Sequence, residues 1–170
     1  MPASRADLLA YLDRLGIATV TFDHPPLFTV EQSRALRGAI PGGHTKNLFL
    51  KDKKDAVFLV VAEEEAEIDM KRLHDRIGSA RLSFGRPELL AELLGVIPGA
   101  VTPFGAINDT TGRVAVVLDE PLMRHERLNF HPLDNAATTT IGRDDLLAFL
   151  RATGHEPRIL AVSGAAVSRS

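Results

Sequence analysis

Residues 44–62 read HTKNLFLKDKKDAVFLVVA. The runs 44–51 and 56–62 flank the polar tetrapeptide at 52–55, a pattern that predicts two antiparallel strands joined by a short turn. Because side chains alternate between the two faces of a strand, Lys46 shares a face with two leucines, and Asn47 lies on the other face. A buried unpaired ammonium group is costly, so this pattern indicates that Lys46 faces a cleft.

Helices and strands are intermixed on both sides of this hairpin. Helices are expected at 4–16, 29–37, 69–77, 87–94 and 144–152, and further strands at 18–23, 81–84, 113–118, 128–131, 138–141 and 158–162. The sequence contains no internal repeat and no interdomain linker. We therefore expect one mixed α/β (α+β) domain over residues 1–163, with a central, mixed but largely antiparallel sheet flanked by helices. Residues 164–170 are expected to form a disordered tail.

The composition narrows the function classes. The chain of 170 residues is 45% hydrophobic and 25% charged, as in ordinary globular proteins, and it has no cysteine. Disulfides, thiolate metal sites and cysteine nucleophiles are therefore excluded. No apolar run approaches the ~20 residues of a membrane span, and the first residues carry charge and helical periodicity. We expect a cytoplasmic protein with no membrane association.

Several catalytic and cofactor motifs are missing from the sequence. None of the six histidines belongs to an H-x-H or H-E-x-x-H pattern, which disfavours a metal site. The chain also lacks a P-loop, a G-x-G-x-x-G fingerprint and a G-x-S-x-G nucleophile elbow. We expect no metal and no cofactor.

Basic residues are concentrated in one part of the chain, although the formal net charge is −2. This balance argues against non-specific nucleic-acid coating, and no DNA partner is expected. The net charge of −2 is still compatible with a local basic face that binds phosphate. The candidate residues for that face are Arg34, Arg37, Lys51, Lys53 and Lys54. Ordinary solvated turns and helix faces are the alternative for each of them.

Three local features suggest chemistry. Lys46 is followed by Asn47 on the strand described above. His131 precedes a proline, which forces an extended backbone and lets the imidazole project from a sheet edge. The segment 95–105 combines three glycines and two prolines with apolar residues, so its backbone N–H groups could stabilise an oxyanion or hold a water. A solvent-facing lysine, a core histidine and a buried connection are the ordinary structural alternatives.

Together these features resemble a known family. HTKNLFLKD at 44–52, PGAVTPFG at 98–105 and FHPL at 130–133, followed by the threonine-rich run 138–141, occur in the order found in the YbaK/ProX family of prolyl-tRNA-synthetase-associated editing domains. The resemblance covers nearly the whole chain. It is strongest to free-standing ProX-type deacylases, which hydrolyse alanine mischarged onto proline tRNA.

The resemblance implies a mixed α/β fold without a metal and assigns roles to residues. The family's essential lysine corresponds to Lys46, and its pocket histidine to His131. Its Gly-x-x-x-Pro loop begins at Gly99. The implied substrate-binding residues are Asn47, Ala100, Val101, Thr102 and Pro103. The implied partners are tRNA(Pro) charged with alanine and, as a further candidate, prolyl-tRNA synthetase.

Alternatives remain open for both substrate and mechanism. Cys-tRNA(Pro) or another aminoacyl-tRNA, or non-catalytic binding of tRNA or a small ligand, would fit the same motifs. Lys46 could grip the terminal phosphate or donate to the ester carbonyl. The base could be His131, whose intrinsic pKa is suitable, or a ribose hydroxyl of the substrate itself. We favour the substrate-assisted route.

Overall fold

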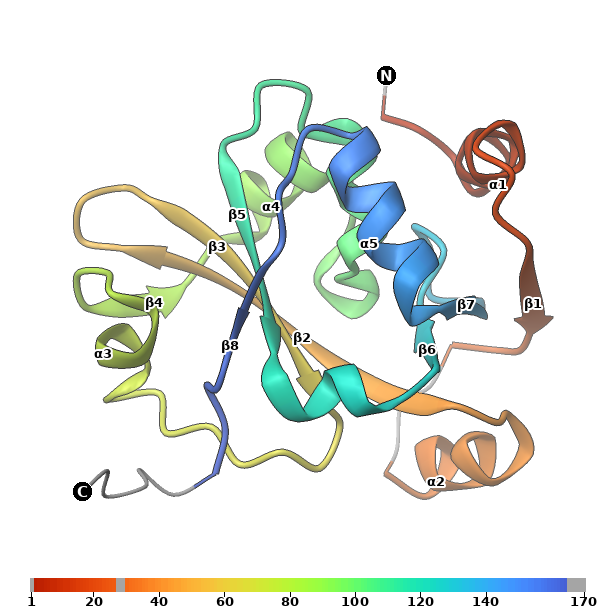
Figure 1. The fold of residues 1–170 in the computed structure, drawn as a ribbon, viewed down its shortest axis with the longest axis horizontal. Helices are drawn as coiled ribbons and strands as arrows, with labels where there is room; N and C mark the ends of the chain where they lie inside the picture. Colours follow the sequence, from red (N-terminus) through yellow and green to blue (C-terminus); the bar gives the residue numbers. More distant parts are fainter. Residues whose placement is uncertain (1, 27–29, 165–170) are drawn as a thin grey trace.

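The computed structural model describes residues 2–26 and 30–164 as one α/β domain built on an eight-stranded sheet (Figure 1). The helices are α1 Arg5–Arg14, α2 Val30–Ala39, α3 Leu73–Ile77, α4 Pro87–Leu94 and α5 Arg143–Ala152, with 3₁₀ turns η1 Pro98–Ala100, η2 Pro103–Asn108 and η3 Glu120–Arg124. The strands are β1 Thr19–Asp23, β2 Gly43–Asp52, β3 Val57–Glu63, β4 Leu82–Phe84, β5 Val114–Asp119, β6 Arg127–Phe130, β7 Ala137–Gly142 and β8 Arg158–Leu160.

The sheet order is β1-β7-β6-β2-β3-β5-β8, with β4 pairing with β2 outside this path. Four of the seven strand pairings within the described residues are antiparallel, which confirms the predicted mixed sheet. The predicted hairpin is confirmed as well, because β2 and β3 pair antiparallel from Thr45↔Glu63 to Lys51↔Val57. No helix of the described residues has the length and apolar character needed to cross a membrane.

Each face of the sheet carries its own hydrophobic core. The larger core contains Phe49 of β2 and Phe104 of η2, together with buried leucines of α1, α4 and α5. The smaller core contains Leu50 of the opposite face of β2, packed against α3. The strict alternation of β2 and β3 between the two cores explains why β3 is almost entirely buried and apolar.

The helix ends follow local sequence signals. Ser4 and Asp7 form a capping box at the start of α1, and Pro87 occupies the first turn of α4. Gly95 ends α4 with a left-handed φ of 68°. The expected helix at 69–77 is shorter, because α3 begins only at Leu73. Helix α2 continues to Ala39, whereas its predicted cap, Thr29, lies outside the described residues.

The two halves of the sheet meet over a very short contact. Strand β6 pairs with β2 in parallel only at Gly43↔Leu128 and His44↔Asn129. Beyond this point, β6 leads away from β2 toward β7 and β1, which lie on the right of Figure 1, whereas β3, β5 and β8 lie on the left.

Residues 162–164, the last described part of the chain, are held to the domain. The Gly164 N–H donates to the Glu67 carbonyl at 2.8 Å, and Asp119 accepts a hydrogen bond from the Val162 N–H at 2.8 Å. The first residue of the predicted tail is therefore attached, and residues 165–170 lie outside the described residues.

Candidate active site

Lys46 lies two residues beyond the last β2–β6 pair, on the face of β2 that carries the smaller core. Its ammonium group is half-buried and donates to the Ala66 carbonyl in the segment that follows β3. An ammonium group has three N–H donors, so two remain for a ligand. The carbonyl thus satisfies part of a charge that would otherwise be costly to bury, and it fixes the direction of the side chain.

His131 lies two residues beyond Asn129, the partner of His44, and directly after the end of β6. Its Nδ1 donates to the Ala137 carbonyl at 3.0 Å. Burial lowers the pKa of His131 below its ordinary value of 6.5, and His24 lowers it further, against the opposing effect of the Ala137 hydrogen bond and of Asp134. The neutral ring with Nδ1–H leaves Nε2 as a hydrogen-bond acceptor.

Asn47 lies on the opposite face of β2 and has an unsatisfied acceptor. The Thr45 hydroxyl donates to the Asn129 carbonyl at 2.7 Å, so it accepts from Asn47 Nδ2, at 3.5 Å. This arrangement orients the amide of Asn47. Its Oδ1 is buried and has no hydrogen-bond partner among the described residues. Such orphaned acceptors are rare because each costs about 1–3 kcal/mol, and they call for an explanation such as a ligand.

The glycine- and proline-rich segment folds into two 3₁₀ turns rather than an open loop. Gly99 is exposed within η1, and the Ala100 N–H donates to the Ile97 carbonyl at 2.9 Å. Thr102 is buried, and its hydroxyl accepts from the Phe104 N–H at 3.2 Å. Because the Ala100 N–H is already used, the N–H groups of Gly99 and Val101 are the candidate oxyanion donors.

The side chains of this segment differ in their access to a ligand. Ala100, Thr102 and Pro103 are buried, whereas Val101 is partly buried against the larger core. The buried residues can shape a site through the backbone, and they offer no exposed side chain to a substrate. A Cβ atom added to Gly99 would contact only Asn135 Nδ2, at 3.5 Å. Gly99 therefore lies beside the turn 131–136 that carries His131.

The predicted tRNA-binding residues fall into two groups. Arg34 is exposed on α2, at the N-terminal end of β2, and the side chain of Arg37 lies outside the described residues. Lys51 pairs with Asp55 at 3.3 Å, and Lys53 and Lys54 are exposed in the β2–β3 turn. Figure 1 shows α2 and this turn at opposite ends of β2. The basic residues therefore do not form one patch.

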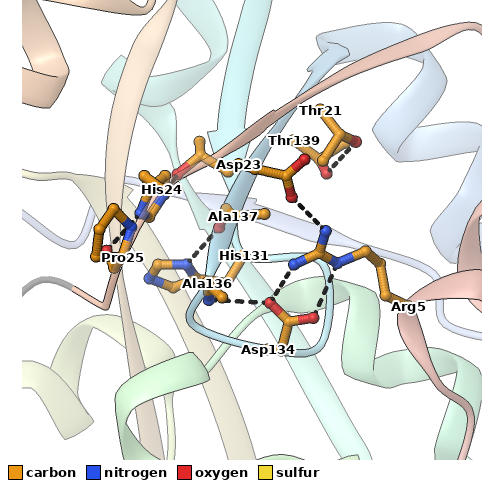
Figure 2. A network of polar contacts seen from close by, with 11 residues as sticks. Arg5, Thr21, Asp23, His24, Pro25, His131, Asp134, Ala136, Ala137 and Thr139 are labelled. Carbon is orange, nitrogen blue, oxygen red and sulfur yellow. Dashed lines mark hydrogen bonds and ion pairs between the residues drawn. The ribbon is translucent and has the colours of Figure 1, made fainter.

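The sequence analysis missed a polar network next to His131 (Figure 2). His24, directly after β1, lies with its ring centroid 6.5 Å from that of His131, and its Nε2 is 2.8 Å from the Thr138 hydroxyl. Arg5 of α1 forms a bidentate pair with Asp134, at 2.8 and 2.9 Å. One signal was available, because His24 and His131 both precede a proline at the end of a strand.

Within residues 2–26 and 30–164, no group of three or more histidine, aspartate or glutamate side chains is arranged to hold a metal ion.

Residues 24–149 match the aminoacyl-tRNA editing domain family. The chain belongs to this family. The editing domain is 41% identical over 159 residues to prolyl-tRNA synthetase associated domain-containing protein 1 of Danio rerio, covering 92% of this chain and 86% of the relative. It is 38% identical over 156 residues to the prolyl-tRNA editing protein ProX of Acetoanaerobium sticklandii, covering 91% and 94%.

A solved structure supports the fold. The structure of a candidate trans-editing enzyme for prolyl tRNA synthetase superposes with a TM-score of 0.68 at 21% identity, covering 94% of this chain and 98% of that chain. The resemblance to the YbaK/ProX family is thus confirmed. Family membership makes the editing domain a hydrolase of the aminoacyl-tRNA deacylase type.

Proposed function

We propose that this editing domain hydrolyses the ester bond of alanine mischarged onto tRNA(Pro), acting in trans as a quality-control step of translation. Two relatives that cover most of the chain carry prolyl-tRNA editing or prolyl-tRNA synthetase association in their names. The observation that carries the proposal is the match of residues 24–149 to the aminoacyl-tRNA editing domain family, and two polar groups of β2 support it: the half-buried ammonium of Lys46 and the unpaired Oδ1 of Asn47.

The choice of alanine rests on the physical limit of amino-acid selection. A synthetase pocket sized for proline excludes the smaller alanine poorly, because each missing methylene is worth only about 1–3 kcal/mol. A second site that admits alanine and rejects proline by volume completes a double sieve. In this proposal, Gly99 and the partly buried Val101 would form the entrance of that site, and the proline ring would collide with their turn.

Lys46 and Asn47 would bind the two polar ends of the substrate. The remaining N–H donors of Lys46 anchor the terminal phosphate or the ester carbonyl, and a protonated lysine does not act as a base. The orphaned Oδ1 of Asn47 accepts a hydrogen bond from the substrate's amino group or from a ribose hydroxyl. Substrate binding would thus satisfy an acceptor that the free protein leaves unpaired.

The ester carbonyl would be polarised by the backbone of the Gly99–Val101 turn. Donors aimed at the developing oxyanion stabilise the transition state, and loss of one such donor typically costs about 10²–10³ in rate. A ribose hydroxyl next to the ester positions the attacking water. Neutral His131 presents Nε2 as an acceptor for the substrate amine or for that water, which orients the reactants without a second charge in the site.

The surface around the site would receive the acceptor stem of the tRNA. Arg34 on α2 lies near the N-terminal end of β2, whereas Lys53 and Lys54 lie at the far end of the same strand. Ten residues of strand span about 33 Å, so the two groups would contact phosphates in different parts of the stem. Such contacts give salt-dependent affinity with little dependence on sequence. Prolyl-tRNA synthetase is the further partner that we propose.

The test is release of amino acid from purified tRNA(Pro) charged separately with alanine, cysteine or proline. Wild-type protein is expected to release alanine fastest and to leave prolyl-tRNA intact. Faster release of cysteine would reassign the substrate, and saturable binding without release would reject the enzymatic function.

Lys46 supplies the matched variants for this assay. Lys46→Met keeps the aliphatic stem and removes the charge, and Lys71→Met makes the same change at an exposed lysine on a turn before α3. We expect a severe loss of deacylation for Lys46→Met and none for Lys71→Met. Unchanged turnover in Lys46→Met would contradict the role of Lys46.

A further inference from the structure

Arg5, the first residue of α1, joins two segments that are distant in sequence. Its Nε and Nη2 donate to the two carboxylate oxygens of Asp134, and its Nη1 donates to Asp23 at 2.6 Å. Asp23 is the last residue of β1, and Asp134 lies in the turn between β6 and β7. The Arg5 side chain is only 27% exposed, so this pair is better shielded than an ordinary surface salt bridge.

Arg5 is connected to the ring of His131 through Asp134 and the backbone of residues 136 and 137. Asp134 Oδ1 accepts from the Ala136 N–H at 3.0 Å, and the next carbonyl, that of Ala137, accepts from His131 Nδ1. The Ala136 carbonyl in turn accepts from the His24 N–H at 3.0 Å. The peptide units of residues 136 and 137 therefore hold both histidine segments, and Figure 2 shows Arg5 clasping Asp23 and Asp134 beside them.

We propose that Arg5 is a positioning residue of the site, which holds the turn 131–136 so that the Ala137 carbonyl fixes the tautomer and orientation of His131. A bidentate guanidinium–carboxylate pair defines geometry in a way that a lysine at the same position cannot. Arg5 itself contacts no reacting atom. The kinetic part of this inference rests on the proposed function, whereas its electrostatic part concerns His131 alone.

The charges around His131 make the inference testable in two opposite directions. The charged or titratable groups that act on the ring are Asp134 on its own turn and His24 after β1. Arg5 of α1 acts through Asp134, with which it is paired, and it also pairs with Asp23. Loss of Arg5 leaves the Asp134 carboxylate unneutralised, which raises the pKa of His131. Replacement of Asp134 by asparagine removes the attraction, which lowers that pKa.

The experiment measures the His131 titration by NMR in wild-type protein, Arg5→Gln and Asp134→Asn, with Arg14→Gln as the control. Arg14 lies on the same helix, is exposed, and stacks over Tyr11, so its loss removes one positive charge from α1 without touching the turn. We expect the His131 pKa to rise in Arg5→Gln, to fall in Asp134→Asn, and to stay at the wild-type value in Arg14→Gln. This readout needs no enzymatic turnover, so it stands even if the substrate is not alanyl-tRNA(Pro).

Deacylation kinetics complete the test. Arg5→Gln is expected to lower kcat about 10-fold with little change in KM, since small misplacements of positioned groups can cost up to about 10²-fold in rate. The same shift of the His131 pKa in both variants, or no shift in Arg5→Gln relative to Arg14→Gln, would overturn the inference. If the wild-type protein deacylates alanyl-tRNA(Pro), an Arg5→Gln variant with the same kcat as wild type would also overturn the inference.

Discussion

Gly99→Ala should separate the activity of this protein from its stability. The added Cβ would meet only Asn135 Nδ2, at the ordinary contact distance of 3.5 Å. Gly99 lies in a 3₁₀ turn and is not one of the glycines with positive φ, so alanine fits its backbone conformation. The new methyl group would stand on the exposed side of η1, where we place the ester carbonyl and its attacking water.

The expected magnitudes follow from this geometry. Alanine restricts the unfolded chain more than glycine does, so stability should stay constant or rise by about 0.4–1 kcal/mol. If the methyl group displaces the ester from one backbone donor, the rate should fall about 10²-fold, which corresponds to ~2.7 kcal/mol of transition-state stabilisation.

Gly105→Ala is the matched control, because it places the same methyl group in the same segment but inside the core. There the Cβ would lie 2.8 Å from Leu94 Cβ and 3.0 Å from the Leu94 carbonyl oxygen. Neither atom can move without shifting α4. Overpacking of this kind costs about 1–3 kcal/mol, which lowers Tm by roughly 2–12 °C in a chain of this size.

The assay combines thermal unfolding with single-turnover deacylation of alanyl-tRNA(Pro). We expect Gly99→Ala to keep its Tm and lose activity, and Gly105→Ala to lose Tm while its folded fraction keeps most of its activity. Full activity in Gly99→Ala would refute the placement of the ester carbonyl at η1. A large drop in Tm for the same variant would refute the open space that the structure shows beside Gly99.

Three further predictions concern titration, core stability and tRNA binding. Burial lowers the His131 pKa in the folded state, so the contribution of His131 to stability is complete above pH 6.5 and is lost as the pH falls from there through the folded-state pKa. In urea unfolding, the stability of His131→Gln should therefore decline less than that of wild type between neutral and acidic pH. Parallel curves would contradict this prediction. Asp109 pairs with the buried His155 at 2.8 Å and accepts a hydrogen bond from the Val114 N–H. Asp109→Asn should therefore lower the free energy of unfolding, measured by chemical denaturation, by about 3–5 kcal/mol. A loss below about 1 kcal/mol would show that the pair is dispensable. Replacing Lys53 and Lys54 by glutamine should weaken tRNA binding and reduce its salt dependence by up to about two phosphate contacts, and an unchanged salt slope would exclude the β2–β3 turn from the interface.

Much of the fold follows from local signals in the sequence. The two runs at 44–51 and 56–62, joined by the polar residues 52–55, predict a hairpin from sequence positions that are close together. The capping box at Ser4 and the left-handed Gly95 likewise act within one helical turn. The start of α3 was misplaced because the residues before Leu73 are compatible with a helix but form a turn instead.

Candidate site residues could be found from the sequence wherever one residue was unusual in its own surroundings. Lys46 stood on an apolar strand face, and His131 preceded a proline. No local pattern in the sequence indicates that Arg5, His24 and Asp134 lie around His131, because these residues come from three separate segments of the chain.

By itself, the sequence therefore determined the hairpin, the capping of α1 and the glycine end of α4, and it supplied the residue types of the candidate site, since these depend on neighbours within a few positions. Only the tertiary structure decided that β6 leaves β2 after two paired residues, that Asn47 Oδ1 has no hydrogen-bond partner among the described residues, and that the basic residues divide into two groups. These properties depend on how distant segments pack, and long-range packing is fixed by the sum of many weak contacts rather than by any one pattern.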